Sequence, residues 1–323
     1  MAGRTVFSLA CLLCSVALGA TPPGDCRALI VSGDPGGEPN AAARFHDWTS
    51  RWNKLLRDEY GVKASNVRVL WSPAVVGKPE MANVPVEDQA TLANVAAALS
   101  RLVQETREGD QAVLILVGHG YESEGIGKFC LPGKDLSDTE AGRLLQGLHG
   151  KQFICINAAP SSSPWAKSLS GPNRIIITAT VLPGMGSQTY FSEFLLRALS
   201  PGGVTLLDAF NRASLNAIRW YQNQFVRKDS TLVHGREFQE IWKAMYPDRR
   251  MEPGGADPKE ASNDPKDMAA WLGRRLIAEV AGLEDNGDGT PTAIYEEGKP
   301  ITLLPAQPGG DGEKSRSIIL GKP

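Results

Sequence analysis

Short apolar runs alternate with longer amphipathic segments along most of the chain. Turn-forming residues bound the apolar runs, and valine, isoleucine and leucine dominate them, which is typical of buried β-strands. Five runs are expected strands: residues 27–32, 66–71, 112–117, 153–156 and 174–180. Because strands that are apolar on both faces must be covered on both faces, the pattern predicts an α/β fold with a mostly parallel sheet between two helical layers.

The amphipathic segments are the expected helices. They cover residues 41–60, 92–103, 138–148, 190–199 and 206–224. In the first segment Phe45, Trp48 and Trp52 recur at helical spacing, so they predict one buried face. Asp88 and Thr91 precede the second segment and are candidate caps of its first turn. We therefore expect a single α/β domain over residues 26–225.

Beyond this domain the composition and the apolar pattern of the chain change. Residues 226–306 contain helical patterns at 236–245 and 267–281, separated by a stretch rich in glycine, proline and aspartate. We expect this part to be a C-terminal helical extension. Residues 307–323 are polar and contain too few apolar side chains to fold alone, so we expect a disordered tail.

The first twenty residues have the form of a signal peptide. Arg4 precedes an apolar stretch at residues 6–18, and Gly19-Ala20 supply small residues for cleavage. About 13 apolar residues are too few to span a bilayer. The pattern predicts export to the periplasm or the cell exterior. Lipid attachment at Cys11 or Cys14 is a weaker alternative, and no integral membrane segment is expected in the mature chain.

Composition and charge narrow the function classes. The chain has 323 residues, a formal net charge of −2 and no basic run, so nothing indicates a nucleic-acid partner. The histidines have no metal-ligand spacing, and we expect neither a metal nor a cofactor. After leader removal three cysteines remain, Cys26, Cys130 and Cys155, so at least one thiol is not in an intramolecular disulfide.

Two expected strands end in polar tips. Gly118-His119-Gly120 follows the strand at 112–117, and Asn157-Ala158-Ala159 follows the strand at 153–156. Because parallel strands end at the same edge of a sheet, the two tips should meet there, where ligands usually bind. The first tip offers an imidazole that could act as a general base. The second offers alanine where a nucleophile would complete the pair.

The two tips and their spacing resemble the caspase-like cysteine peptidases, in particular the legumain-like peptidase family C13 and its bacterial relatives. In that family a strand ending in His-Gly is followed, about forty residues later, by a strand ending in Asn-Ala-Cys or a similar triplet. Here His119-Gly120 matches the first motif, and Asn157-Ala158-Ala159 matches the second with alanine in place of cysteine. The resemblance extends from about Cys26 to Tyr295, and it implies a three-layer caspase-hemoglobinase-like fold.

The resemblance also implies roles for individual residues. His119 would be equivalent to the general base, and Gly120 would contribute to the oxyanion site. Ala159 would occupy the nucleophile position, where its methyl group cannot attack a substrate. Losing the nucleophile of such a unit costs on the order of 10⁶ in kcat. We therefore expect an inactive pseudopeptidase that binds a peptide or protein partner at the old active-site edge. The candidate cleft residues are Asn157, Ser161, Ser162 and Cys130.

Other functions stay open at this stage. An active hydrolase could use His119 with a displaced nucleophile, either Ser161, Ser162 or Cys130. A structural envelope protein with a vestigial cleft is a further alternative. An alanine introduced at position 159 to inactivate an enzyme is another, although the intact leader disfavours it.

Residues 284–289, Glu-Asp-Asn-Gly-Asp-Gly, resemble half of a calcium loop. Twelve positions from Glu284 stands Tyr295 instead of the bidentate glutamate that such a loop requires. A turn is therefore the favoured interpretation.

Overall fold

The computed structural model describes residues 24–36, 39–72, 84–148, 150, 152–181, 189–226, 279–296 and 299–323. The expected signal peptide lies outside these residues. So do the expected helix at 236–245 and most of that at 267–281. The main sheet has seven strands in the order β10-β9-β8-β4-β1-β2-β3. All its pairings are parallel except that of β10 with β9.

The expected strands are present within one or two residues. They are β1 (Cys26–Ser32), β2 (Val67–Trp71), β4 (Gln111–Val117), β8 (Gln152–Asn157) and β9 (Arg174–Thr178). Two strands were not expected in the sheet, β3 (Asp88–Gln89) and β10 (Gly282–Glu284). Both are short edge strands, and so few residues carry no readable periodicity.

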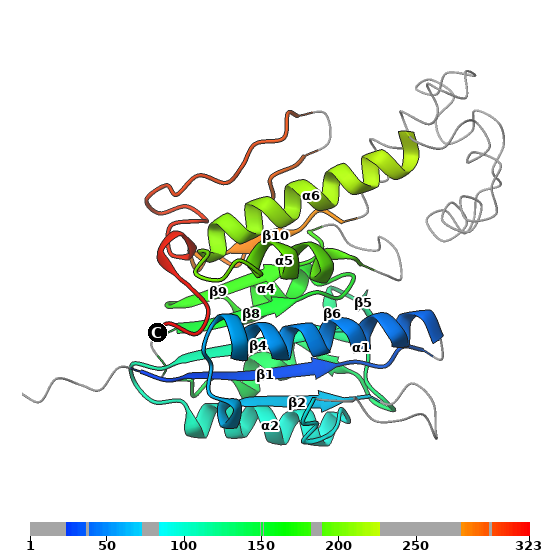
Figure 1. Ribbon diagram of the computed structural model, residues 1–323, viewed down its shortest axis with the longest axis vertical. Coiled ribbons are helices and arrows are strands. Elements are labelled where there is room, and N and C mark those ends of the chain that lie inside the picture. The colour runs from blue at the N-terminus through cyan, green and yellow to red at the C-terminus, as the bar shows by residue number, and fades with distance from the viewer. Residues whose placement is uncertain are drawn as a thin grey trace, which may run out of the picture.

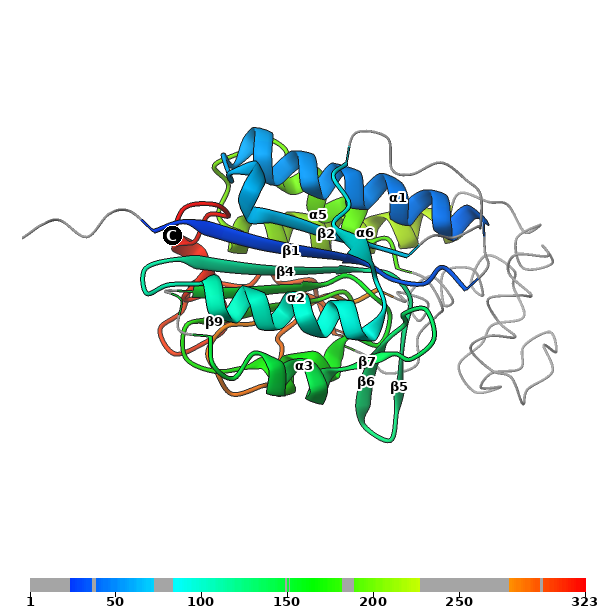
Figure 2. The ribbon, with the colours of Figure 1, turned by 90° about the horizontal axis from the view of Figure 1, so that it is seen from below.

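Helices cover both faces of the sheet, which confirms the three-layer α/β expectation (Figures 1 and 2). In β4, Val113, Ile115 and Val117 belong to one apolar core, and the alternate residues belong to the other. One face packs α1 (Pro39–Lys54), α5 (Phe191–Leu199) and α6 (Leu206–Val226). The opposite face packs α2 (Leu92–Glu105), α3 (Asp138–Leu144) and α4 (Ser163–Leu169).

Several helices differ in detail from their predicted limits. The first expected helix continues as a π-helical turn, η1 (Leu55–Glu59), and a short 3₁₀ turn, η2 (Ala64–Asn66), leads into β2. Thr91 caps α2, since its Oγ1 accepts a hydrogen bond from the Asn94 amide at 3.3 Å. No helix in the described ranges combines the length and apolar content needed to cross a bilayer.

A small second sheet connects β4 to α3. It contains β5 (Gly120–Ser123), β6 (Ile126–Phe129) and β7 (Leu136–Ser137), paired antiparallel in that order. None of the five strands expected from the sequence falls in these residues. Glu124 and Gly125 both have positive φ, 55° and 77°, and form the tight turn of the β5–β6 hairpin.

The expected helical extension is wrong for the part of it that the structure describes. Within residues 279–296 and 299–306 the chain forms strand β10 and irregular segments, with no helix. Leu283 of β10 is fully buried and pairs with Ile177 of β9. This segment therefore completes the edge of the main sheet and is part of the same domain.

The expected disordered tail is also wrong. Residues 307–323 form turns, a 3₁₀ turn η3 (Ser315–Ser317) and a β-bridge between Ile319 and Lys322. Leu320 is fully buried, and the Gln111 side chain accepts from the Gly321 amide at 2.7 Å and donates to the Ile319 carbonyl at 3.1 Å. The tail has too few apolar residues to fold alone, but it is ordered by packing on the domain.

Candidate functional site

The carboxyl ends of the central strands form the candidate site. Strand β1 lies between β2 and β4, and the helix that follows β1 covers one face while the helix that precedes β4 covers the other. The chain thus changes direction across the sheet between β1 and β4. In open α/β sheets ligands bind outside the carboxyl ends at such a switch point. His119 follows β4 there, and Ala159 follows the neighbouring strand β8.

Two glycines allow the strand tips to approach each other. A Cβ at Gly118 would lie 2.9 Å from the Phe129 ring and 3.1 Å from the Gly33 Cα. A Cβ at Gly33 would meet the same ring at 2.9 Å and the Cys130 carbonyl oxygen at 2.5 Å. The fully buried Phe129 therefore occupies the space that side chains at these glycines would need. This packing brings the tips of β1 and β4 together beneath the second sheet.

His119 is half-buried between α1 and the second sheet. Its imidazole packs edge-on against the Phe45 ring of α1, with the ring centroids 5.1 Å apart. Its carbonyl accepts a hydrogen bond from the Cys130 amide at 3.0 Å. These contacts orient the histidine from both sides. The role of Phe45 was missed from the sequence, where it appears only as one member of a helical apolar stripe.

Ala159 and Gly120 lie in contact, as the resemblance implies for a nucleophile position and an oxyanion position. A Cβ built on Gly120 would be 3.1 Å from the Ala159 methyl and 2.7 Å from the Pro160 carbonyl oxygen. Ala159 is only 1% exposed. The two sequence motifs therefore meet at the sheet edge, and no side chain other than hydrogen fits at position 120.

Asn157 organises the turn that carries Ala159. Its Oδ1 accepts a hydrogen bond from the Ala159 amide at 3.0 Å, two residues ahead, which is an Asx-turn. Its Nδ2 is buried without a partner among the described residues. Thr189 contributes a further bond by donating its hydroxyl to the Ala158 carbonyl. The Asn157 side chain thus fixes the backbone of the turn and is buried away from solvent.

The two serines are integrated into the turn as well. Ser161 adopts a left-handed backbone with φ of 51° and is 4% exposed. Ser162 is fully buried, and its Oγ accepts from the Thr180 amide while its own amide donates to the Thr180 Oγ1, both at 3.3 Å. This reciprocal pair ties the tip of β8 to that of β9.

Cys130 reaches the same edge with its backbone. The Asp34 amide donates to its carbonyl at 2.9 Å, which joins the β1 tip to the second sheet. Burial, with a smaller contribution from the nearby Asp135 and Asp34 carboxylates, raises the pKa of the Cys130 thiol to about 11. At neutral pH the side chain is a thiol, whereas nucleophilic attack requires the thiolate.

A pocket of about 640 Å³ is lined by the β5–β6 hairpin and α4, the two elements that follow the strand tips of the candidate site. It lies between the β5–β6 hairpin, α4 and the loop at 289–291, and its polar lining includes Glu122, Asp138 and Lys167. Its volume is within the range of small-ligand sites.

The 284–289 segment forms the expected turn, in which Glu284 Oε1 accepts a hydrogen bond from the Gly287 amide at 2.6 Å. Among the residues described, no group of three or more His, Cys, Asp and Glu side chains is placed to hold a metal ion.

Comparisons with known proteins give distant structural likenesses and nothing nearer. No known protein family and no curated protein matches the chain. Among solved structures, protein GSU0716 from Geobacter sulfurreducens superposes with a TM-score of 0.41 and 14% sequence identity, over 60% of this chain and 89% of that one.

Proposed function

We propose that this protein is an exported, catalytically inactive member of the caspase-like, legumain-type fold that binds a peptide or protein partner at the carboxyl edge of its sheet. The observation that carries this proposal is the contact between Gly120 and Ala159 beside His119. A histidine tip, a glycine and the turn of the adjacent strand lie together, as the resemblance to cysteine peptidases requires. The residue at the nucleophile position has only a methyl group.

The available nucleophiles favour binding over hydrolysis. Ser162 uses its hydroxyl to fasten two strand tips, and Ser161 is buried in a left-handed turn. Cys130 has a raised thiol pKa, whereas catalytic cysteines have lowered ones. A displaced nucleophile would need a hydrogen-bonded base, and misplacement by about 1 Å already costs on the order of 10² in rate.

Restoring cysteine at position 159 tests the inherited geometry. In a Cys130→Ser background, we expect Ala159→Cys to be alkylated by iodoacetamide below pH 7, because a neighbouring imidazolium lowers a thiol pKa. The reaction should lose this low-pH component when His119→Ala is added. Ala158→Cys, one residue earlier, is the matched control and should react only at alkaline pH. Equal pH profiles at positions 158 and 159 would contradict the proposed pairing.

Binding is tested with peptides selected from a random octapeptide display library on the wild-type chain. Tyr121 and Leu303 are both exposed, at 44% and 51%, but only Tyr121 adjoins the candidate site. We expect Tyr121→Ala and His119→Ala each to weaken binding about tenfold by fluorescence anisotropy, and Leu303→Ala to leave it unchanged. Equal affinity in all three variants would mean that the peptide does not bind at this edge of the sheet. Peptide turnover that disappears in His119→Ala would instead establish an enzyme.

A further inference from the structure

A second pocket, of about 760 Å³, lies at the opposite edge of the main sheet. It is formed where strands begin: Phe153 is near the start of β8, Arg174 starts β9, and Gly109 shortly precedes β4. Leu148, Phe153 and Pro172 supply apolar walls. The pocket shares no lining residue with the His119 edge, so a ligand there would be separate from the proposed partner site.

Among the described lining residues, Arg174 is the one with a cationic side chain. Its Nη1 donates to the Leu169 carbonyl at 3.1 Å and its Nη2 donates to the Leu145 carbonyl at 3.0 Å, at the ends of α4 and α3. The guanidinium carbon lies 5.5 Å from the centre of the Phe153 ring. A guanidinium has five N–H donors. Two of them are used in these bonds, and three have no acceptor among the described residues.

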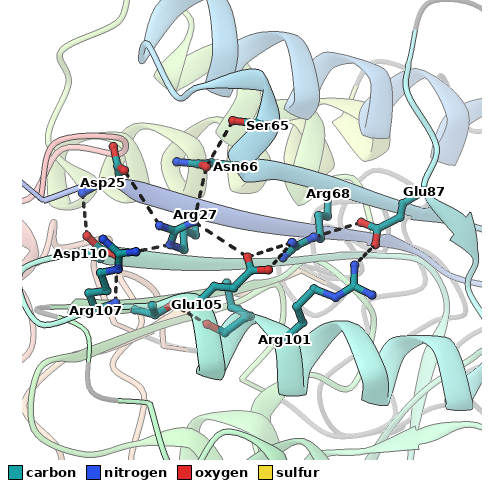
Figure 3. Close-up of polar contacts among 12 residues, drawn as sticks. Asp25, Arg27, Ser65, Asn66, Arg68, Glu87, Arg101, Glu105, Arg107 and Asp110 are labelled. Carbon is teal, nitrogen blue, oxygen red and sulfur yellow. Dashed lines mark hydrogen bonds and ion pairs between the residues drawn. The ribbon is translucent and has the colours of Figure 1, made fainter.

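The charge of Arg174 is not matched by a carboxylate in the described part of the chain. Several arginines elsewhere in the fold pair with carboxylates. Figure 3 shows Arg27 with Asp110, Arg68 with Glu105 and Arg101 with Glu87. Arg174 has only neutral carbonyl partners, and burial lowers its pKa. Glu108 is the one carboxylate among the described lining residues; it is exposed and makes no ion pair with Arg174.

We propose that this pocket binds a small organic anion that carries a carboxylate on an apolar body. The free N–H donors of Arg174 match the geometry of a carboxylate, which accepts two parallel hydrogen bonds from a guanidinium. Leu148, Phe153 and Pro172 remove the apolar part of the ligand from water. Both existing carbonyl bonds of Arg174 remain in place when the anion binds, so the two helix ends stay capped.

The proposal is tested on the full chain with benzoate and benzamide, which share a ring but differ in charge. In ¹H–¹⁵N correlation spectra we expect benzoate to shift the amides of Gly109, Gly150 and Asn173 saturably. Benzamide should bind about tenfold more weakly, because hydrogen bonds to a charged acceptor are stronger. Shifts that do not saturate, or that are equal for the two compounds, overturn the proposal.

Two variants locate the site. Arg174→Lys should weaken benzoate binding about tenfold, because an ammonium cannot provide the paired N–H donors. Since Arg174 also caps two helices, this variant changes stability as well, and Glu108→Gln serves as the second test. It removes the competing carboxylate from the pocket and should tighten benzoate binding two- to fivefold. Leu303→Ala is the control. Unchanged affinity in both Arg174→Lys and Glu108→Gln overturns the assignment.

Discussion

At the scale of single residues, glycine and alanine decide what the carboxyl edge can do. Gly33 and Gly118 leave the space that Phe129 fills, and Gly120 lets the β8 turn approach to contact distance. Ala159 completes this packing with a methyl group. These small residues bring the two motifs together, and the alanine places only a methyl group where they meet.

Gly118→Ala should destabilise the fold by about 1–3 kcal/mol, the usual cost of overpacking a buried site. The added methyl would lie 2.9 Å from the Phe129 ring. The cost is measured from urea unfolding. It should be smaller in a Phe129→Leu background, since the shorter side chain leaves room. Gly310→Ala is the control, because its nearest contact would be 3.7 Å and ordinary. Equal costs at 118 and 310 would rule out the crowding.

The partly buried thiol of Cys130 makes the stability of the fold depend on pH. The pKa of its thiol is raised to about 11 in the folded protein, and burial likewise raises that of Cys26 to about 12. The pKa of a thiol in an unfolded chain is about 8.5. The folded state therefore holds its thiol protons more tightly, so this contribution to stability is present below about pH 8.5 and is lost as pH rises toward 11. The free energy of unfolding should fall across that window.

The alkylation rate of Cys130 checks the same shift in the wild-type chain. We expect the rate with iodoacetamide to rise about tenfold per pH unit up to pH 10, because only the thiolate reacts. Unfolded protein in urea is the reference and should level off near pH 9. A plateau between pH 7 and 8 in the folded protein would indicate an activated cysteine and would contradict the non-catalytic proposal.

At the scale of elements, the second sheet links the candidate site to α3. Strand β5 begins at Gly120, and β7 ends at Ser137, the residue that caps α3. In this capping box the Glu140 amide donates to the Ser137 Oγ at 3.1 Å, and the Ser137 amide donates to Glu140 Oε2 at 3.1 Å. The same three strands therefore position His119 and start the helix that packs beside α2.

Ser137→Ala should cost about 1 kcal/mol of folding free energy, since it removes the acceptor of the capping box. Ser137→Thr retains a hydroxyl and should recover most of the loss in a urea titration. Thr91→Ala on α2 is the matched comparison, because its cap lacks the reciprocal carboxylate and should cost the same or less. A neutral Ser137→Ala would mean that β7 alone holds this end of α3.

At the scale of the whole molecule, the C-terminal residues close the domain. Asp285, directly after β10, accepts from the Gly312 amide at 2.9 Å and the Ser315 amide at 2.8 Å. Asp311 accepts in return from the Asp285 amide at 2.9 Å. Gln111, at the start of β4, holds Gly321 and Ile319. The last residues of the chain therefore anchor the amino end of a central strand.

Leu320→Ala should destabilise the whole domain by about 2–5 kcal/mol, the range for deleting a fully buried leucine side chain. The loss is measured by chemical denaturation, and limited proteolysis should show faster cleavage of the tail. Lys322→Ala, two residues on and exposed, is the control and should be nearly neutral. An unchanged free energy of unfolding in Leu320→Ala would mean that the tail is not packed on the domain.

Periodicity determined much of this fold from the sequence. The five long strands and the helices between them follow from apolar runs and helical stripes, because burial of these residues constrains every position. The order of the strands in the sheet does not follow from periodicity. The meeting of His119, Gly120 and Ala159 also follows, since parallel strands end at one edge. Short strands such as β3, β10 and β7 do not follow, because two or three residues carry no period.

Only the tertiary structure decided the fate of the C-terminal part and the state of the candidate nucleophiles. The tail is too polar to fold alone, and it is ordered by buried carboxylates and Gln111, which are distant in sequence. Burial of Ser162 beside Thr180 and the raised thiol pKa of Cys130 depend on neighbours from other strands. The sequence by itself determined which residues meet at the edge. Their surroundings, assembled from distant parts of the chain, decided how each can react.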